Sequence, residues 1–315
     1  MLILGFDIGG TKCAAVTAEW DGMKIKLLNK EKCETDLGLT PDKMIEKLIS
    51  MADGILERKP DSIGISCGGP LDSEKGIIMS PPNLPGWDHV EIGKQLEAHY
   101  GVPAHLQNDA NACAVAEWKF GAGMGFDNVV FMTFGTGLGA GLILGGKLYT
   151  GTNDNAGEIG HMRLDRFGPV GYGKAGSFEG FCSGGGIAQL GYTMALEKAQ
   201  TGEYPAYFKK GYTQADVTAK TIADAANAGD PTACEVYRIC GEYLGRGLSV
   251  IIDLLNPQII IIGSIFARSK NLLWESAEKI IKKEALRLSA DCCRVVPAQL
   301  GEQIGDYAAV ATALL

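Results

Sequence analysis

Two glycine-rich segments carry residues suited to binding phosphate. Phe6-Asp7-Ile8-Gly9-Gly10-Thr11 and Phe134-Gly135-Thr136-Gly137-Leu138-Gly139 each follow an apolar run and precede a second strand-like run. Glycine lets backbone N–H groups approach an anion closely, and threonine adds a hydroxyl donor. Either segment alone also fits a plain β-hairpin with a glycine turn. The occurrence of two copies favours phosphate binding.

Asp7 places a carboxylate inside the first of these segments. A carboxylate next to phosphate is repulsive unless a hard cation lies between them. Mg²⁺ prefers oxygen ligands and keeps several of its waters. We therefore predict Mg²⁺ at Asp7, bound through water.

Two other nucleotide-binding motifs nearly match the second segment. Gly135-x-Gly137-x-x-Ala140 fits the dinucleotide fingerprint, but that fingerprint requires a helix next, and residues 141–150 lack a helical period. Gly145-Gly146 instead indicates a hairpin turn. The run Gly141-x-x-x-x-Gly146-Lys147-Leu148 is one residue from a P-loop, with leucine in place of the hydroxyl that would hold Mg²⁺. We set both motifs aside.

Three polar residues are candidates for contact with a second ligand. Glu158 and His161 lie three residues apart, a pairing that suits a polar small molecule, although a loop acid and a structural histidine would look the same. Asp109 precedes an alanine-rich helical segment and is expected as its N-cap. Capping uses one carboxylate oxygen and leaves the other for chemistry.

Strands and helices must position these residues. Apolar runs predict strands at about 2–8, 12–17, 24–28, 62–66, 104–107, 129–134, 259–262 and 294–298. Helices are predicted from Pro41, with Thr40 as N-cap, and at about 90–99, 110–120, 186–200, 214–228, 231–255, 271–288 and 306–315. Strands lead each half and helices follow, which predicts an α/β fold.

Length and composition limit the class of protein. The 315 residues allow two domains. We expect them at 1–120 and 121–299, with a closing helix, about 300–315, packed back on the first. The net charge of −8 gives no electrostatic footprint for nucleic acid or a membrane. Nine scattered cysteines and no secretory or membrane-spanning run indicate reduced thiols in a cytoplasmic protein.

The ordered set of motifs resembles the ROK family of sugar kinases and repressors (repressor, open reading frame, kinase). The resemblance runs along nearly the whole chain. Its segments are Asp7-Ile8-Gly9-Gly10-Thr11-Lys12, Gly68-Gly69-Pro70-Leu71-Asp72, Asn83-Leu84-Pro85-Gly86-Trp87, Asn108-Asp109-Ala110-Asn111-Ala112, Gly135-Thr136-Gly137-Leu138-Gly139, Gly157-Glu158-Ile159-Gly160-His161 and Asn256-Pro257. It implies a two-domain actin-like ATPase (ribonuclease H-like) fold with a cleft between the domains.

The resemblance also implies a function and a set of site residues. It implies a homodimeric kinase that uses ATP and Mg²⁺ to phosphorylate a hexose, glucose at O6 above all, with Asp109 as general base. The implied sugar-binding residues are Gly69, Asn83, Asn108, Asp109, Glu158, His161 and Glu179. The implied ATP-binding residues are Asp7, Gly9, Gly10, Thr11, Lys12, Gly135, Thr136, Gly137, Gly184, Gly263 and Ser264, with Gly184–Gly186 beside the adenosine.

The resemblance to this family leaves other substrates and another function open. Fructose, mannose, allose or an N-acetylhexosamine are alternative substrates, and a non-catalytic sugar sensor is an alternative function. Repressor members carry a DNA-binding helix-turn-helix before the kinase-like part. The strand expected from Leu2 leaves no room for one here.

One part of the family's pattern is missing. The resemblance implies a structural zinc held by His161 and three cysteines, but Val170, Tyr172 and Ser177 stand where the cysteines belong. Structural zinc needs about four nitrogen or sulfur ligands, and nearby Cys182 does not rebuild the set. We therefore predict no structural zinc, and packing of Tyr172 and Phe178 as the substitute.

Overall fold

The computed structural model describes residues 1–315 and divides into two compact units. Unit 1 comprises Met1–Asp127, Gly141–Ala156 and Gln299–Leu315, and unit 2 comprises Asn128–Ala140 and Gly157–Ala298. The sequence predicted domains at 1–120 and 121–299; the units separate instead after Asp127, and 141–156 belongs with the first.

Unit 1 is built on a five-stranded sheet of order β3-β2-β1-β4-β7. Its strands are β1 (Leu2–Ile8), β2 (Lys12–Trp20), β3 (Ile25–Glu34), β4 (Ser62–Cys67) and β7 (Ala104–Asn108). The first three are antiparallel neighbours, whereas β4 and β7 run parallel to β1. The carboxyl ends of β1, β4 and β7 therefore meet at one edge of the sheet. Asp7, Cys67 and Asn108 lie at that edge.

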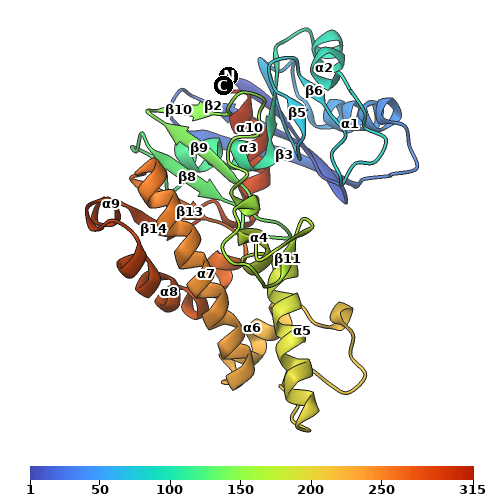
Figure 1. The fold of residues 1–315 in the computed structure, drawn as a ribbon. Coiled ribbons are helices and arrows are strands. Elements are labelled where there is room, and N and C mark those ends of the chain that lie inside the picture. Colours follow the sequence, from blue (N-terminus) through green and yellow to red (C-terminus); the bar gives the residue numbers. More distant parts are fainter. The chain divides into compact units, whose positions relative to one another are not determined.

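Helices cover both faces of this sheet. They are α1 (Pro41–Ile55), α2 (Ile92–Tyr100), α3 (Asp109–Phe120) and α10 (Ile304–Thr312). Unit 1 also contains the hairpin of β5 (Leu71–Asp72) with β6 (Ile77–Ile78), most of the hairpin of β9 (Ala140–Leu144) with β10 (Lys147–Tyr149), and the turn η3 (Gly301–Gln303). Thr40 caps α1 as expected, and Met44, Ile45 and Leu48 on its inner face are buried. Helix α10 closes the chain and lies beside α3 and against β1 (Figure 1).

Unit 2 has a set of longer helices and three parallel strands, which belong to a second five-stranded sheet of order β10-β9-β8-β13-β14. Strand β13 (Ile259–Ile262) pairs in parallel with β8 (Val129–Met132) and with β14 (Arg294–Pro297). The helices are α4 (Phe178–Phe181), α5 (Gly184–Gln200), α6 (Ala219–Asn227), α7 (Pro231–Leu255), α8 (Ile265–Glu284) and α9 (Arg287–Cys292). A small hairpin, β11 (Val170–Gly171) with β12 (Lys174–Ala175), and the turns η1 (Ile159–His161) and η2 (Gln214–Asp216) complete it (Figure 1).

Most predicted elements are confirmed, and two helix starts were wrong. Helix α6 begins at Ala219 rather than 214, because Gln214–Asp216 forms a separate 3-10 turn. Helix α8 begins at Ile265 rather than 271, directly after the isoleucine strand. Gly145 and Gly146 form the expected hairpin turn, with φ of 58° and 71°. All nine cysteines are free thiols, and no helix has the length and apolar character to cross a membrane.

Candidate active site

In unit 1, the predicted site residues gather where the parallel strands end. The turn after β1 is closed by the Gly9 N–H donating to the Lys12 carbonyl, at 3.1 Å. Gly10 lies directly on the backbone of Asn83, where a methyl group would overlap the carbonyl oxygen, so this close approach requires glycine. A methyl at Gly69 would lie 3.1 Å from Nδ2 of Asn108. Loops far apart in the sequence thus come together at one edge.

The general-base candidate Asp109 begins helix α3, but it does not cap it. Strand β7 extends to Asn108, which keeps the extended backbone of an N-cap, and its Oδ1 accepts from the Ala110 N–H at 2.9 Å. Asp109 is the first helical residue, with its Oδ1 2.8 Å from the same N–H. The sequence predicted Asp109 as the N-cap of α3, but the N-cap is the preceding residue, Asn108.

Asp7 lies among other acids. Burial, together with the carboxylates of Asp109 and Asp306, raises the pKa of Asp7 to about 6. Its Oδ2 faces Gly305 in the first turn of α10. Lys30 opposes the increase and is itself paired with Asp306. This edge of unit 1 therefore favours a cation.

In unit 2, the second glycine loop faces the starts of two long helices. The loop folds back on itself, since the Gly139 N–H donates to Thr133 Oγ1 at 2.9 Å. The Gly184 N–H of α5 donates to the Gly135 carbonyl at 2.8 Å, and the Ile265 N–H of α8 donates to Phe134 at 2.9 Å. Helix N-termini present N–H groups and a positive dipole end, which suits an anion. No helix follows the loop directly, which confirms that it is not a Rossmann turn.

The α8 start has an unusual backbone. Ser264 is the N-cap with φ of 55° and ψ of −114°, and its side chain makes no capping hydrogen bond. A non-glycine residue in such a region is strained, and strain of this kind gathers at functional sites. Gly263, before it, donates to the Met132 carbonyl at 3.0 Å and so joins the ends of β13 and β8.

Glu179 supports the glycine loop, a role that the sequence did not indicate. Its Oε2 accepts from the Leu138 N–H at 3.0 Å, and a methyl group at Gly137 would lie 2.8 Å from the same oxygen. Glu158 and His161 lie at the two ends of the η1 turn, and both are exposed. Glu158, His161 and Glu179 all belong to unit 2, as do Gly135, Thr136, Gly137, Gly184, Gly263 and Ser264.

A cavity of about 380 Å³ opens beside the start of α8. This size is within the range of small-molecule sites. It is lined by Ala219, Lys220, Ala223, Asp224, Asn227, Tyr237, Ile265, Arg268 and Ser269. None of these residues was predicted as a site residue. The prediction began the last helix of this region at 271, which left Ile265, Arg268 and Ser269 in a loop. A helix starting right after Gly263-Ser264 would have indicated them.

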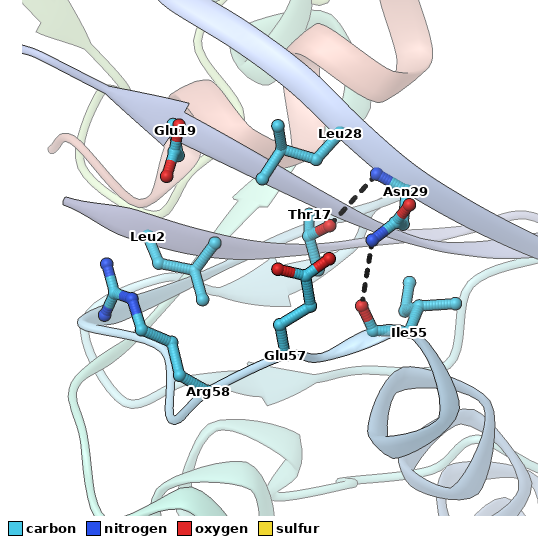
Figure 2. A pocket seen from close by; sticks show the side chains of 8 residues that line it. All are labelled: Leu2, Thr17, Glu19, Leu28, Asn29, Ile55, Glu57 and Arg58. Atoms are coloured by element: carbon cyan, nitrogen blue, oxygen red, sulfur yellow. Dashed lines mark hydrogen bonds between the residues drawn. The ribbon is translucent and has the colours of Figure 1, made fainter.

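A second, smaller hollow lies at the opposite end of the unit 1 sheet. Figure 2 shows it around the start of β1, with the side chains of Leu2, Glu57 and Arg58 at its edge. Its volume is about 190 Å³. Asn29 is already engaged there by Thr17 Oγ1 and by the carbonyl of Ile55. None of the predicted site residues lines this hollow, so we assign it no part in the chemistry.

Comparison with known proteins agrees with this architecture. Residues 3–314 match the ROK family. The chain is 32% identical over 310 residues to the glucokinase of Streptomyces coelicolor, covering 96% of this chain and 95% of that one. The crystal structure of a ROK family glucokinase from Streptomyces griseus, in complex with glucose and AMPPNP, matches with a TM-score of 0.78 and 29% identity, over 100% of this chain and 99% of that one.

A regulator is also similar. The ROK family transcriptional regulator homologous to the E. coli Mlc protein matches with a TM-score of 0.82 and 26% identity, over 99% of this chain and 78% of that one. Kinases and a regulator thus share these elements, as the resemblance implied. With its actin-like ATPase fold and a match over almost every residue, the chain belongs to the ROK family.

Proposed function

We propose that this protein transfers the γ-phosphoryl group of ATP to a hexose, with glucose as the substrate and O6 as the acceptor. The observation that carries the proposal is that unit 1 has a carboxylate-rich sheet edge and that unit 2 has a glycine loop at the N-termini of two helices. Phosphoryl transfer depends on positioning and on charge neutralisation, and these two regions supply both. The similarity to glucokinases of about the same length supports the sugar class.

Asp109 acts as the general base in this proposal. Its carboxylate accepts the proton of the sugar hydroxyl as that oxygen attacks the γ-phosphorus, and the bond to the bridging oxygen of ADP breaks. A positioned base contributes about 10²–10⁴-fold to the rate. Asn83, Asn108 and Gly69 in unit 1 hold the sugar hydroxyls, together with Glu158, His161 and Glu179 of unit 2. Amide and carboxylate groups suit a ring with several hydroxyls.

The glycine turns hold the nucleotide. Gly9, Gly10, Thr11 and Lys12 contact its phosphates from unit 1, and Gly135, Thr136 and Gly137 do so from unit 2. In this proposal the adenosine binds in the cavity next to Ser264, and Gly184 and Gly263 also contact the nucleotide. The volume of the cavity supports the assignment, as do the first residues of α6 and α8 in its lining.

Asp7 holds Mg²⁺ through water in this proposal. Burial raises the pKa of Asp7 most, and the carboxylates of Asp109 and Asp306 raise it further; these acidic neighbours suit a cation. No group of three or more His, Cys, Asp or Glu residues could hold a metal alone, so phosphate and water supply its other ligands. When bound, Mg²⁺ neutralises charge on the phosphates. We further propose a cytoplasmic homodimer, as in the resemblance.

A coupled ADP-release assay tests the proposal. We expect turnover with glucose, and a panel of fructose, mannose, allose and N-acetylhexosamines ranks the alternative substrates. Sugar-free reactions measure ATP hydrolysis as the control. A chain that binds sugar but is inactive with every sugar and every nucleoside triphosphate is a sensor, the function that the similarity to a transcriptional regulator favours. That result would overturn the kinase proposal.

A further inference from the structure

The hairpin β11–β12 in unit 2 turns through an unusual residue. Its two central residues, Tyr172 and Gly173, have φ of 44° and 75°, and the flanking pairs are Val170 with Ala175 and Gly171 with Lys174. Two-residue turns of this type favour Asn-Gly, since both positions need positive φ. Tyrosine there carries a conformational cost. The turn alone does not require a tyrosine.

Two side chains of the hairpin contact the predicted sugar ligand His161. The Tyr172 ring lies edge-on to the imidazole, with centroids 5.2 Å apart and planes at 79°. Lys174 Nζ donates to the His161 carbonyl at 2.7 Å. Edge-to-face ring contacts contribute about 0.5–1.5 kcal/mol. The hairpin therefore holds His161 by its ring and by its backbone.

The other side of the hairpin is fixed to helices α4 and α5. The Gln189 side-chain amide pairs with both backbone groups of Val170: its Oε1 accepts from the N–H at 3.0 Å, and its Nε2 donates to the carbonyl at 2.8 Å. Gly171 packs on the start of α4, where a methyl group would lie 2.6 Å from the Gly180 nitrogen and 2.9 Å from Glu179 Cβ. The hairpin thus links His161 to the segment that carries Glu179.

The same segment does not fit the zinc that the family resemblance implies. Val170 offers no ligand atom, and Ser177 is fully buried with its Oγ accepting from the Gly180 N–H at 3.0 Å, as the cap of α4. Zinc would have one imidazole and no thiolate. Phe178, which we expected in the brace, is instead a core residue whose ring lies against Gly247 of α7.

We propose that this hairpin is a metal-free clamp, in which Tyr172 and Lys174 are positioning residues for His161 and Gln189 anchors the hairpin to α5. This deepens the proposed function, because the clamp would set the geometry of the sugar-binding side chains. Sugar affinity then depends on the Tyr172 ring and on the hydrogen bonds of Lys174 and Gln189. Treatment with a zinc chelator should leave that affinity unchanged.

Matched variants at one position separate the ring from the turn. Tyr172→Asn keeps a residue that favours the turn and removes the ring, whereas Tyr172→Phe keeps the ring. Lys174→Met removes the hydrogen bond to the His161 carbonyl. The readouts are zinc content by atomic absorption, hydrogen exchange of residues 159–164 and 176–180 with and without a chelator, and separate KM values for glucose and ATP.

We expect less than one-tenth of an equivalent of zinc and exchange that the chelator does not change. Tyr172→Asn and Lys174→Met should speed exchange in 159–164 and raise the KM for glucose about two- to tenfold, with the KM for ATP unchanged, while Tyr172→Phe matches the wild type. Stoichiometric zinc, exchange accelerated by the chelator, or a Tyr172→Asn variant equal to wild type in exchange or in glucose KM would overturn the clamp. Zinc content and hydrogen exchange test the clamp independently of the proposed function, because neither measurement requires kinase activity.

Discussion

The two glycine turns share a sequence pattern and have opposite electrostatic surroundings. At the β1–β2 turn, the carboxylates of Asp109 and Asp306 lie near Asp7, and they add to the increase in the pKa of Asp7 that burial causes. The loop from Phe134 to Gly139 faces the N-termini of α5 and α8 instead. The strand–glycine–strand pattern thus determines the backbone shape of each turn. The elements packed around the turn determine whether its surroundings favour a cation or an anion.

Among the changes considered, Asp109→Asn should have the largest effect. It removes the proposed general base from the acidic region of unit 1. We expect kcat to fall about 10²–10⁴-fold, since the amide cannot accept the hydroxyl proton. Steady-state ADP release measures the change. Glucose affinity by calorimetry is the control and should stay within a few-fold of wild type. Turnover within tenfold of wild type would reject Asp109 as the base.

Asp7→Asn should stabilise the ligand-free protein at pH 7 and abolish its response to Mg²⁺. The pKa of Asp7 is higher folded than unfolded, so its ionisation opposes folding, and wild-type stability should fall as pH rises from about 4 to about 6. We expect the variant to gain about 1–3 kcal/mol at pH 7, from 1.36 kcal/mol per pKa unit. Urea unfolding between pH 4 and pH 7 measures this. An equal pH slope in both proteins would contradict it.

The glycines of the two turns should differ in their tolerance of a methyl group. Gly10→Ala would push against the backbone of Asn83, which cannot rotate away, and should cost about 1–3 kcal/mol of unfolding free energy. Gly137→Ala meets only the end of the Glu179 side chain, 2.8 Å away, and should cost less. Urea unfolding of both variants makes the comparison. A larger loss for Gly137→Ala would show that the loop in unit 2 is the more rigid one.

Ser264→Gly should have the smallest effect. Glycine accepts the positive φ of 55° without strain, but it loses more backbone entropy on folding. We expect a gain in unfolding free energy of up to about 1 kcal/mol, measured by urea unfolding, with the KM for glucose unchanged. A loss above about 1 kcal/mol would mean that the serine side chain, and not the backbone, shapes the start of α8.

The sequence predicted the strands and turns well because their signals are local. Buried runs such as Leu2–Ile8 and Ile259–Ile262 allow no other element, and Gly145-Gly146 specifies its own turn. The cap of α3 was missed by one residue, since an Asn-Asp pair gives two good caps and the length of β7 decides between them. That length is set by pairing with β4, which is not a local property.

The sequence predicted which residues belong to the site, but it did not predict the contacts that these residues make with one another. Glu179 was predicted as a sugar ligand from the family resemblance, whereas its hydrogen bond to Leu138 joins residues 41 positions apart and was not predicted. The missing cysteines led us to expect Tyr172 and Phe178 as the substitute for zinc, but they did not indicate the ring contact between Tyr172 and His161. The anchoring of Val170 by Gln189 had no sequence signal either. Contacts that depend on tertiary packing are visible only once the fold is known.

The most direct test of the central claim is identification of the product. Purified protein is incubated with ATP, Mg²⁺ and glucose, and the reaction is followed by phosphorus NMR with proton coupling. The account predicts ADP and a single phosphomonoester whose phosphorus couples to the two protons on C6. ADP and inorganic phosphate without a phosphomonoester, or ATP left intact while glucose binds, would contradict it.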